Sequence, residues 1–481
     1  MTVLVSSLIY NNMKKNLLLY IFTALFFIPA FLLKRDLWDG VIISHAFETK
    51  NPEIYWNWFT ESGWFLTPYF YDVFYYVFNH DNFLQYFYLF FLVCHIVSTH
   101  QLYKLSRKTF NFDEYSSLVA SAVFALSPLW NIYFSTVFLM HAFTLALALY
   151  CTNRILDYKL NSFIVFSALS LITFQQASIP PVIISILLLD FIIKKDYKNS
   201  YYVFCYILLS IVFFLYARQA FPAHGLYEKY NSIKLDNMLV LGYYDVFLKY
   251  IIDVYPLFIP LLFLSLLLSE CKVKVILFSS LVFTAIIPFI LVGKPAWPSH
   301  LYVIEGWEQR QAITLTIAVS LIFGLMHAIF FESRYRKFLI LSIYISIMML
   351  SIKLYSSIEV KIKSILIQNA IVSELKKNKS IIGDCGIVLT VSISPSFRNF
   401  SSYELNYLAW EAFNERKYIH SSTRRPNNIN IKEIYKDKYI LPNDYPACMK
   451  SVTLHSNIDN LNLYEMFSGR YLKQYFEIKA S

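Results

Sequence analysis

Long apolar stretches, separated by short polar runs, recur along this chain up to about residue 354. One helical crossing of a membrane requires roughly 17 to 25 predominantly apolar residues. The pattern therefore predicts an all-α polytopic membrane protein with about eleven transmembrane helices. The predicted segments are 16–33, 83–103, 117–136, 137–152, 161–179, 180–193, 200–217, 247–269, 275–293, 311–330 and 338–354. Segments 137–152 and 180–193 are short, so they are tilted, broken or re-entrant in this interpretation.

The pattern changes near residue 355, where apolar runs become short and Asn, Ser and Lys accumulate. A strand-like stretch begins with Ile381-Ile382 and continues over 386–391 (Gly-Ile-Val-Leu-Thr-Val), beside turn signals. We expect two domains: a transmembrane domain over 1–354, and a small α/β domain over 355–481, which is long enough to fold alone.

Composition supports a membrane location, because 57% of the 481 residues are hydrophobic and only 15% are charged. The net charge of +10 comes from Lys and Arg scattered at the ends of the apolar segments. A nucleic-acid-binding surface would instead gather these residues on one face. The charge balance therefore argues against a nucleic-acid partner.

Basic residues in the short loops predict the orientation of the chain, because cytoplasmic loops are enriched in Lys and Arg. With the N-terminus in the cytoplasm, every second loop carries such residues, and the opposite loops carry far fewer. We therefore expect a multi-pass protein of the bacterial inner (plasma) membrane with an extracytoplasmic C-terminal domain. The cytoplasmic set is Lys14, Lys15, Lys104, Arg107, Lys108, Arg154, Lys159, Lys194, Lys195, Lys198, Lys272, Lys274, Arg334, Arg336 and Lys337.

Two carboxylates follow the first apolar segment, in the sequence Lys-Arg-Asp-Leu-Trp-Asp-Gly of residues 34–40. Asp36 and Asp39 are expected at the outer membrane surface, where a carboxylate stays solvated and can meet a reacting group held at the bilayer interface. The non-catalytic alternative is an interfacial anchor, in which charged residues and Trp38 lie at the end of a membrane helix. The long aromatic outer loop 34–82 favours the catalytic interpretation, because an anchor does not require it.

Group transfer from a membrane-dissolved donor fits this placement. The chain contains no Walker-type loop, GxGxxG, HExxH or CxxC motif, so we expect a lipid-carried donor rather than a nucleotide. Transfer of a sugar from a polyprenyl phosphate needs a carboxylate base for the acceptor hydroxyl, and cations for the leaving phosphate.

The segment Asp36-Leu37-Trp38-Asp39, followed by Ala125-Leu-Ser-Pro-Leu-Trp130, resembles the C-type (GT-C) superfamily of membrane glycosyltransferases. That superfamily includes protein O-mannosyltransferases and the aminoarabinose and O-antigen glucosyl transferases. The resemblance covers mainly residues 14–200. It implies an inverting glycosyltransferase that uses a polyprenyl phosphate-linked donor, with Asp39 or Asp36 as the catalytic base.

The chain departs from the superfamily pattern in its second outer loop. No Asp or Glu lies between Pro128 and His141, where members often carry an acid. A second acidic role is therefore in doubt, and we predict neither a metal ion nor another cofactor.

A later outer loop, residues 293–310, supplies the candidate contacts to the donor. Arg310 opens an apolar segment from the outer side, and its guanidinium suits bidentate phosphate binding. Lys294 is the second candidate cation, and His300 and Glu308 are further candidates for substrate binding. The alternative is that Arg310 reaches the lipid headgroups or pairs with Glu308.

Two residues near the acidic segment complete the predicted substrate-binding set. Trp38 lies between the two carboxylates, and His45 lies one to two helical turns after Asp39. His45 is a candidate partner of Asp39, although an ordinary solvated loop position explains it better.

Other function classes remain open at this point. A flippase or transporter for lipid-linked glycans usually carries ionisable residues near the bilayer midplane, and the predicted segments are almost free of them. An O-antigen polymerase or ligase would use the same carriers but tends to depend on a large late outer loop. An assembly protein with a partner-binding tail would not need the carboxylates. In the favoured interpretation the partners are the donor, a glycan or lipid-linked acceptor, and the bilayer.

Cysteine usage offers one check on the orientation. Cys385 and Cys448 are the only cysteines of the predicted extracytoplasmic domain. In an oxidising compartment they can form a disulfide, and the alternative is two free buried thiols.

Overall fold

The structure is a computed structural model in which the chain divides into two compact units. Unit 1 comprises the residues up to 28, 88–133 and 138–357, and unit 2 comprises 29–87, 134–137 and 358–481. The boundary at 357/358 lies close to the expected domain boundary at 354/355, but unit 2 also includes the first predicted outer loop. The residues described are 16–29, 31, 35–78, 82–157, 164–165, 168–169, 171–172, 176–194, 197–228, 232–270, 272–294, 307–392, 402–415, 419–421, 448–456 and 476–480.

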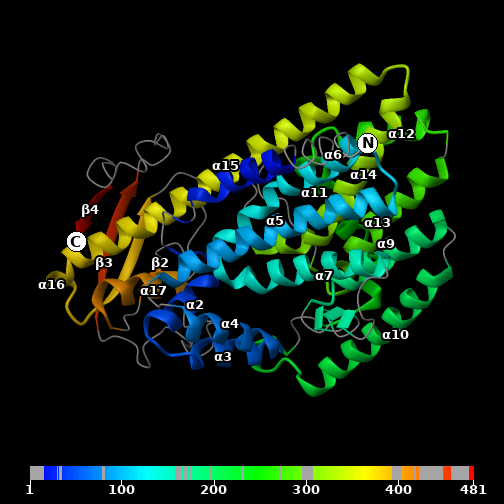
Figure 1. Cartoon of the computed structure of the whole chain (residues 1–481). Helices are drawn as coiled ribbons and strands as arrows, with labels where there is room; N and C mark the ends of the chain where they lie inside the picture. Colours follow the sequence, from blue (N-terminus) through cyan, green and yellow to red (C-terminus); the bar gives the residue numbers. More distant parts are fainter. Residues whose placement is uncertain are drawn as a thin grey trace. The chain divides into compact units, whose positions relative to one another are not determined.

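Unit 1 is built from helices, which are labelled in Figure 1. It begins with a short apolar helix, Asn16–Pro29. The helices that follow are α5 (Phe83–Thr109), α6 (Glu114–Ala125), η2 (Pro128–Phe134), η3 (Thr136–Phe138), α7 (Leu139–Asp157), α9 (Ile179–Lys194), α10 (Tyr197–Ala220), η4 (Gly225–Tyr227), η5 (Leu235–Leu239), α11 (Leu241–Val254), α12 (Phe258–Leu268), α13 (Lys272–Leu291), η6 (Trp307–Ala312), α14 (Ile313–Glu332) and α15 (Arg336–Lys377). Four of them, α5, η2, η3 and α15, have residues in both units.

Several of these helices can cross a membrane. Within the described residues, six are long and apolar enough, and the number rises to eight if each of two bent helix pairs counts as one span. The bent pairs are α6 with η2, at 46°, and α11 with α12, at 93°. Leu257 lies at the second bend with a left-handed φ of 62°.

The expected count of eleven spans is therefore not confirmed. Predicted segment 161–179 lies largely outside the described residues, and α9 has only 16 residues. Segment 137–152, expected to be short, belongs to a continuous apolar stretch of 22 residues, Thr136–Asp157.

Helix α14 is the most enclosed of the candidate spans, with 89% of its most apolar window buried. Gly324 allows this helix to approach α6 closely. A Cβ at this position would lie 2.9 Å from the carbonyl oxygen of Ser116 and 3.0 Å from the Cβ of Ala120. The apolar core of unit 1 therefore depends on a small residue at this crossing.

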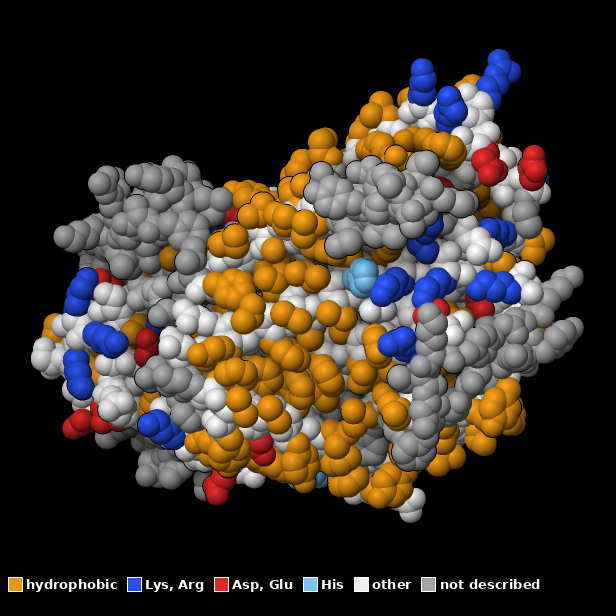
Figure 2. Space-filling model, in the orientation of Figure 1, with side chains coloured by type: hydrophobic (Ala, Val, Ile, Leu, Met, Phe, Trp, Pro, Cys, Tyr) orange, Lys and Arg blue, Asp and Glu red, His pale blue; other side chains and the backbone are white. Residues whose placement is uncertain are grey.

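Helix α5 has apolar side chains on both a buried face and an exposed face. In α5, Leu89 and Val93 are each 50% exposed, whereas Phe87 and Phe91 are buried. Figure 2 shows a face of the molecule on which exposed apolar side chains gather. Such a surface is typical of contact with lipid.

Unit 2 combines short helices with a small sheet. The first predicted outer loop forms α2 (Gly40–Glu48), α3 (Glu53–Glu61) and α4 (Leu66–Val77), and the tail adds α16 (Lys379–Ile382) and α17 (Ser402–Phe413). The strands are β1 (Gly386–Ser392), β2 (Ile419–Ser421), β3 (Met449–Ser456) and β4 (Phe476–Ala480). Their order is β2-β1-β3-β4, and β1 runs parallel to both of its neighbours while β4 is antiparallel to β3. The predicted strand at 386–391 is confirmed, whereas Ile381 and Ile382, expected to be strand-like, lie in α16.

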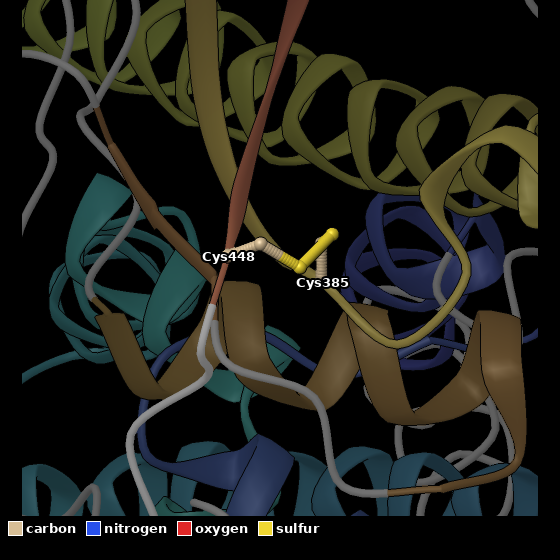
Figure 3. Close-up of a disulfide and its surroundings, with 2 residues drawn as sticks. All are labelled: Cys385 and Cys448. Carbon is tan, nitrogen blue, oxygen red and sulfur yellow. A yellow bond between two sulfur atoms is a disulfide. The ribbon is translucent and has the colours of Figure 1, made fainter.

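Cys385 and Cys448 form a disulfide directly before β1 and β3 (Figure 3). The Gly386 amide also donates a hydrogen bond of 2.9 Å to the Cys448 carbonyl, so the two strands are joined at their starts. The predicted pairing of these cysteines is confirmed.

Candidate functional site

The acidic segment lies in unit 2 and forms a tight turn that leads into α2. Trp38 has a left-handed φ of 52°, and the Gly40 amide donates to the Leu37 carbonyl at 3.1 Å. Asp39 precedes the first helical residue, although its side chain does not cap the helix. The turn brings the two carboxylates to the start of α2.

Asp36 is buried and accepts four hydrogen bonds. Its oxygens accept from the Leu37 amide at 2.8 Å, from the Thr136 amide at 3.1 Å and from the Ser44 hydroxyl at 3.2 Å. The fourth donor is the Thr136 hydroxyl. Burial raises the pKa of Asp36 to about 6, and the hydrogen bonds from Thr136, Leu37 and Ser44 oppose that shift.

Two of these four hydrogen bonds come from Thr136, in the second predicted outer loop, which contains no Asp or Glu. Thr136 lies in the stretch between Pro128 and His141, and Ser135 beside it donates to the Leu37 carbonyl at 2.6 Å. These two residues fasten the acidic segment to that loop by hydroxyl and amide donors.

Gly40 is the second reason that Asp36 fits its site. A Cβ on Gly40 would lie 2.0 Å from Asp36 Oδ1 and 2.4 Å from its Cγ. Real Cβ atoms essentially never approach other atoms so closely. The carboxylate therefore occupies the volume that any larger residue at position 40 would need.

Residues of the C-terminal region complete the surroundings of Asp39 and Trp38. The Tyr403 hydroxyl donates to Asp39 Oδ1 at 2.7 Å, and the Trp38 amide donates to Glu404 Oε1 at 2.9 Å. The Lys361 ammonium lies 3.9 Å from the centroid of the Trp38 ring, a cation–π contact. All five side chains lie in unit 2.

An ion pair between the buried Arg35 and the partly exposed Glu411 holds the start of the segment. Arg35 donates two hydrogen bonds to the Glu411 carboxylate, at 2.6 and 2.7 Å, and a third to Asn369 at 2.6 Å. The fork-shaped guanidinium suits this paired geometry. Arg35 and Glu411 were not among the predicted site residues, because no local pattern links positions 376 residues apart.

Glu48, the last residue of α2, contacts α17. The Tyr407 hydroxyl donates to Glu48 Oε1 at 2.9 Å. Glu48 is exposed as a whole residue, but desolvation of its carboxyl group raises its pKa to about 7, against the opposing effect of the Tyr407 hydrogen bond. His45 is also buried, and its ring centroid lies 4.6 Å from that of Trp410. A substrate-binding role for His45 stays a prediction.

The residues of the later predicted loop lie in unit 1 and are described only in part. Lys294 follows the end of α13, and Arg310 lies in η6. Burial and the positive charges of Arg310 and Arg218 together lower the pKa of Lys294 to about 7. The three cations are therefore close enough to interact, and Arg218 is an addition to the predicted pair.

Two further predicted residues cannot be placed in this way. His300 lies outside the described residues, and the side chain of Glu308 is not described. The proximity of Asp39 to Arg310 also stays a prediction, since the two residues belong to different units. Within the described part of the chain, no group of three or more His, Cys, Asp or Glu side chains has the arrangement of a metal site.

Comparisons of the chain with protein-family models and with curated proteins found no match.

Proposed function

We propose that the protein is an integral-membrane glycosyltransferase that moves a sugar from a polyprenyl phosphate-linked donor to an acceptor outside the cytoplasm. The acceptor class is a surface polysaccharide or a lipid-linked glycan. One observation carries the proposal: a pair of carboxylates sits in a turn outside the candidate membrane spans, and both loop and tail residues hold it in place. Such support is what a general base needs to keep a fixed geometry.

The two carboxylates have different roles in this proposal. Asp36 positions the turn, because four donors already engage its oxygens. Asp39 is the general base and accepts the proton of the acceptor hydroxyl as that oxygen attacks the anomeric carbon. Tyr403 orients the Asp39 carboxylate through its 2.7 Å hydrogen bond.

The leaving group in this reaction is the phosphate of the lipid carrier. Lys294 and Arg310, with Arg218 within electrostatic range of Lys294, form a cationic set suited to a phosphate. Arg310 also lies within electrostatic range of His141, at the start of α7. In the proposed reaction these cations stabilise the negative charge that develops on the carrier.

The proposed location is the bacterial inner membrane, with the N-terminus in the cytoplasm and unit 2 outside. The alternating Lys and Arg bias supports this orientation. The disulfide of unit 2 supports it as well, because disulfides persist in oxidising compartments.

Transfer from a panel of radiolabelled polyprenyl phosphate sugars to cell-envelope glycans, in membranes that contain the protein, tests the proposal. Removal of a general base typically slows a reaction 10²–10⁴-fold, so Asp39→Asn should nearly abolish transfer while the protein still folds. Asp245→Asn is the matched control, because Asp245 is exposed and lies in an i,i+4 pair with Lys249. Full transfer by the Asp39→Asn protein would overturn the assignment of the base. Movement of a lipid-linked glycan across the membrane without any transfer would favour a flippase instead.

A further inference from the structure

A short segment between α10 and α11 is fastened to the end of α13. The Lys234 amide donates to the Leu291 carbonyl at 2.9 Å, and the Asn237 side chain donates to the same carbonyl at 3.1 Å. Helix α13 ends there. The Gly293 amide donates a hydrogen bond to the Ile290 carbonyl, and Gly293 adopts a left-handed φ of 67°. The position of the segment along α13 is therefore fixed.

That position corresponds to one boundary of the hydrocarbon layer. Helix α13 has 20 residues and is a candidate membrane span. At 1.5 Å per residue it is about 30 Å long, which matches the hydrocarbon thickness of a typical bilayer. A segment bonded to its last residue lies where the acyl chains meet the headgroups.

Three leucines of this segment are exceptionally exposed. Leu235, Leu239 and Leu241 are exposed by 75, 82 and 80%, the largest values for any large hydrophobic residue among the described residues. We call these three residues the leucine cluster. Three adjacent exposed leucines are costly in water, since each gains about 1.5–3 kcal/mol on burial.

The neighbours of the leucine cluster suit an interface between lipid and water. Tyr243 and Tyr244 follow it, and Tyr is enriched at the headgroup level of membranes. Tyr244 donates to the Met238 carbonyl at 3.1 Å, which ties the start of α11 to η5. Lys294, three residues beyond Leu291, adds a cation close to the same boundary.

We propose that the leucine cluster inserts into the leaflet at which α13 ends, so that residues 232–243 form an interfacial anchor covered by phospholipid. The depth of the attachment point selects lipid over another protein as the occupant. This anchor does not depend on the reaction proposed above. It holds the segment between α10 and α11 in the membrane surface, close to the Lys294 and Arg310 cations.

Photo-crosslinking in intact membranes tests the anchor. The photoreactive residue p-benzoylphenylalanine replaces Leu239 in one protein and the exposed Asp236 in a matched control. After irradiation, mass spectrometry should find phospholipid adducts at position 239 and far fewer at position 236. Adducts to a second copy or to another protein, or equal lipid adducts at both positions, would overturn the proposal.

A second measurement guards against poor folding of the substituted protein. A polarity-sensitive fluorophore on Leu239→Cys in lipid nanodiscs should be quenched by spin-labelled lipids and protected from aqueous iodide. The same fluorophore on Asp236→Cys should show the opposite preference. Quenching by iodide alone at position 239 would place the leucine cluster in water and would also overturn the proposal.

Discussion

The substitution Gly40→Ala tests how tightly the acidic segment is packed. The new methyl group would lie 2.0 Å from Asp36 Oδ1, and its three nearest heavy atoms all belong to the Asp36 carboxyl group. Either α2 shifts or the carboxylate leaves its four hydrogen bonds. Overpacking costs typically ~1–3 kcal/mol, and a lost hydrogen bond to a charged group costs ~1.5–3 kcal/mol. We therefore expect Gly40→Ala to destabilise unit 2 by about 3 kcal/mol.

The melting temperature of the purified protein in detergent measures this loss. Gly242→Ala is the matched control, because a Cβ on that helical glycine meets no atom within 4 Å. Replacement of Gly by Ala at such a site is neutral or slightly stabilising.

A double-mutant cycle shows whether Asp36 is the cause. The variant Asp36→Ala with Gly40→Ala lacks the atoms that the methyl group would meet, so it should melt close to Asp36→Ala alone. The coupling between the two substitutions should then be about 3 kcal/mol. A Gly40→Ala protein as stable as the Gly242→Ala control, or strictly additive effects in the cycle, would refute this account of the site.

Three further predictions concern unit 2. The raised pKa of Glu48, about 7 against an ordinary value of 4.5, means that the folded protein binds this proton more tightly than the unfolded chain. Its stabilising contribution is therefore present below pH 4.5 and is lost as pH rises to about 7, so Glu48→Gln should flatten the fall in melting temperature between about pH 4.5 and pH 7. Arg35→Lys keeps the charge but loses the paired contact with Glu411, and calorimetry should show a loss of about 2–3 kcal/mol; an unchanged melting temperature would contradict this. Cys385 and Cys448 should resist alkylation in unreduced native protein and react after reduction, and immediate labelling of both would argue against the disulfide.

Local patterns were sufficient for several features of this protein. The length of an apolar run is a local property, so it could predict helices such as α13 and α14 without knowledge of their neighbours. The β1 strand was also predictable from local composition, and the Cys385–Cys448 pair was predictable because these are the only two cysteines after residue 354. The number of spans was less predictable, because bends such as the one at Leu257 interrupt apolar runs of adequate length.

The acidic segment shows what only the tertiary structure decided. The sequence placed Asp36 and Asp39 outside the membrane spans but could not distinguish their roles. Thr136 meets Asp36 across 100 residues, and Tyr403 meets Asp39 across 364. Periodicity carries information over a few turns of helix, whereas these partners are chosen by the packing of distant segments, under the requirement that a buried carboxylate be hydrogen-bonded. The length of apolar runs thus determined where the chain can cross a membrane. Packing determined that Asp36 accepts hydrogen bonds on both oxygens and that Asp39 accepts one from Tyr403.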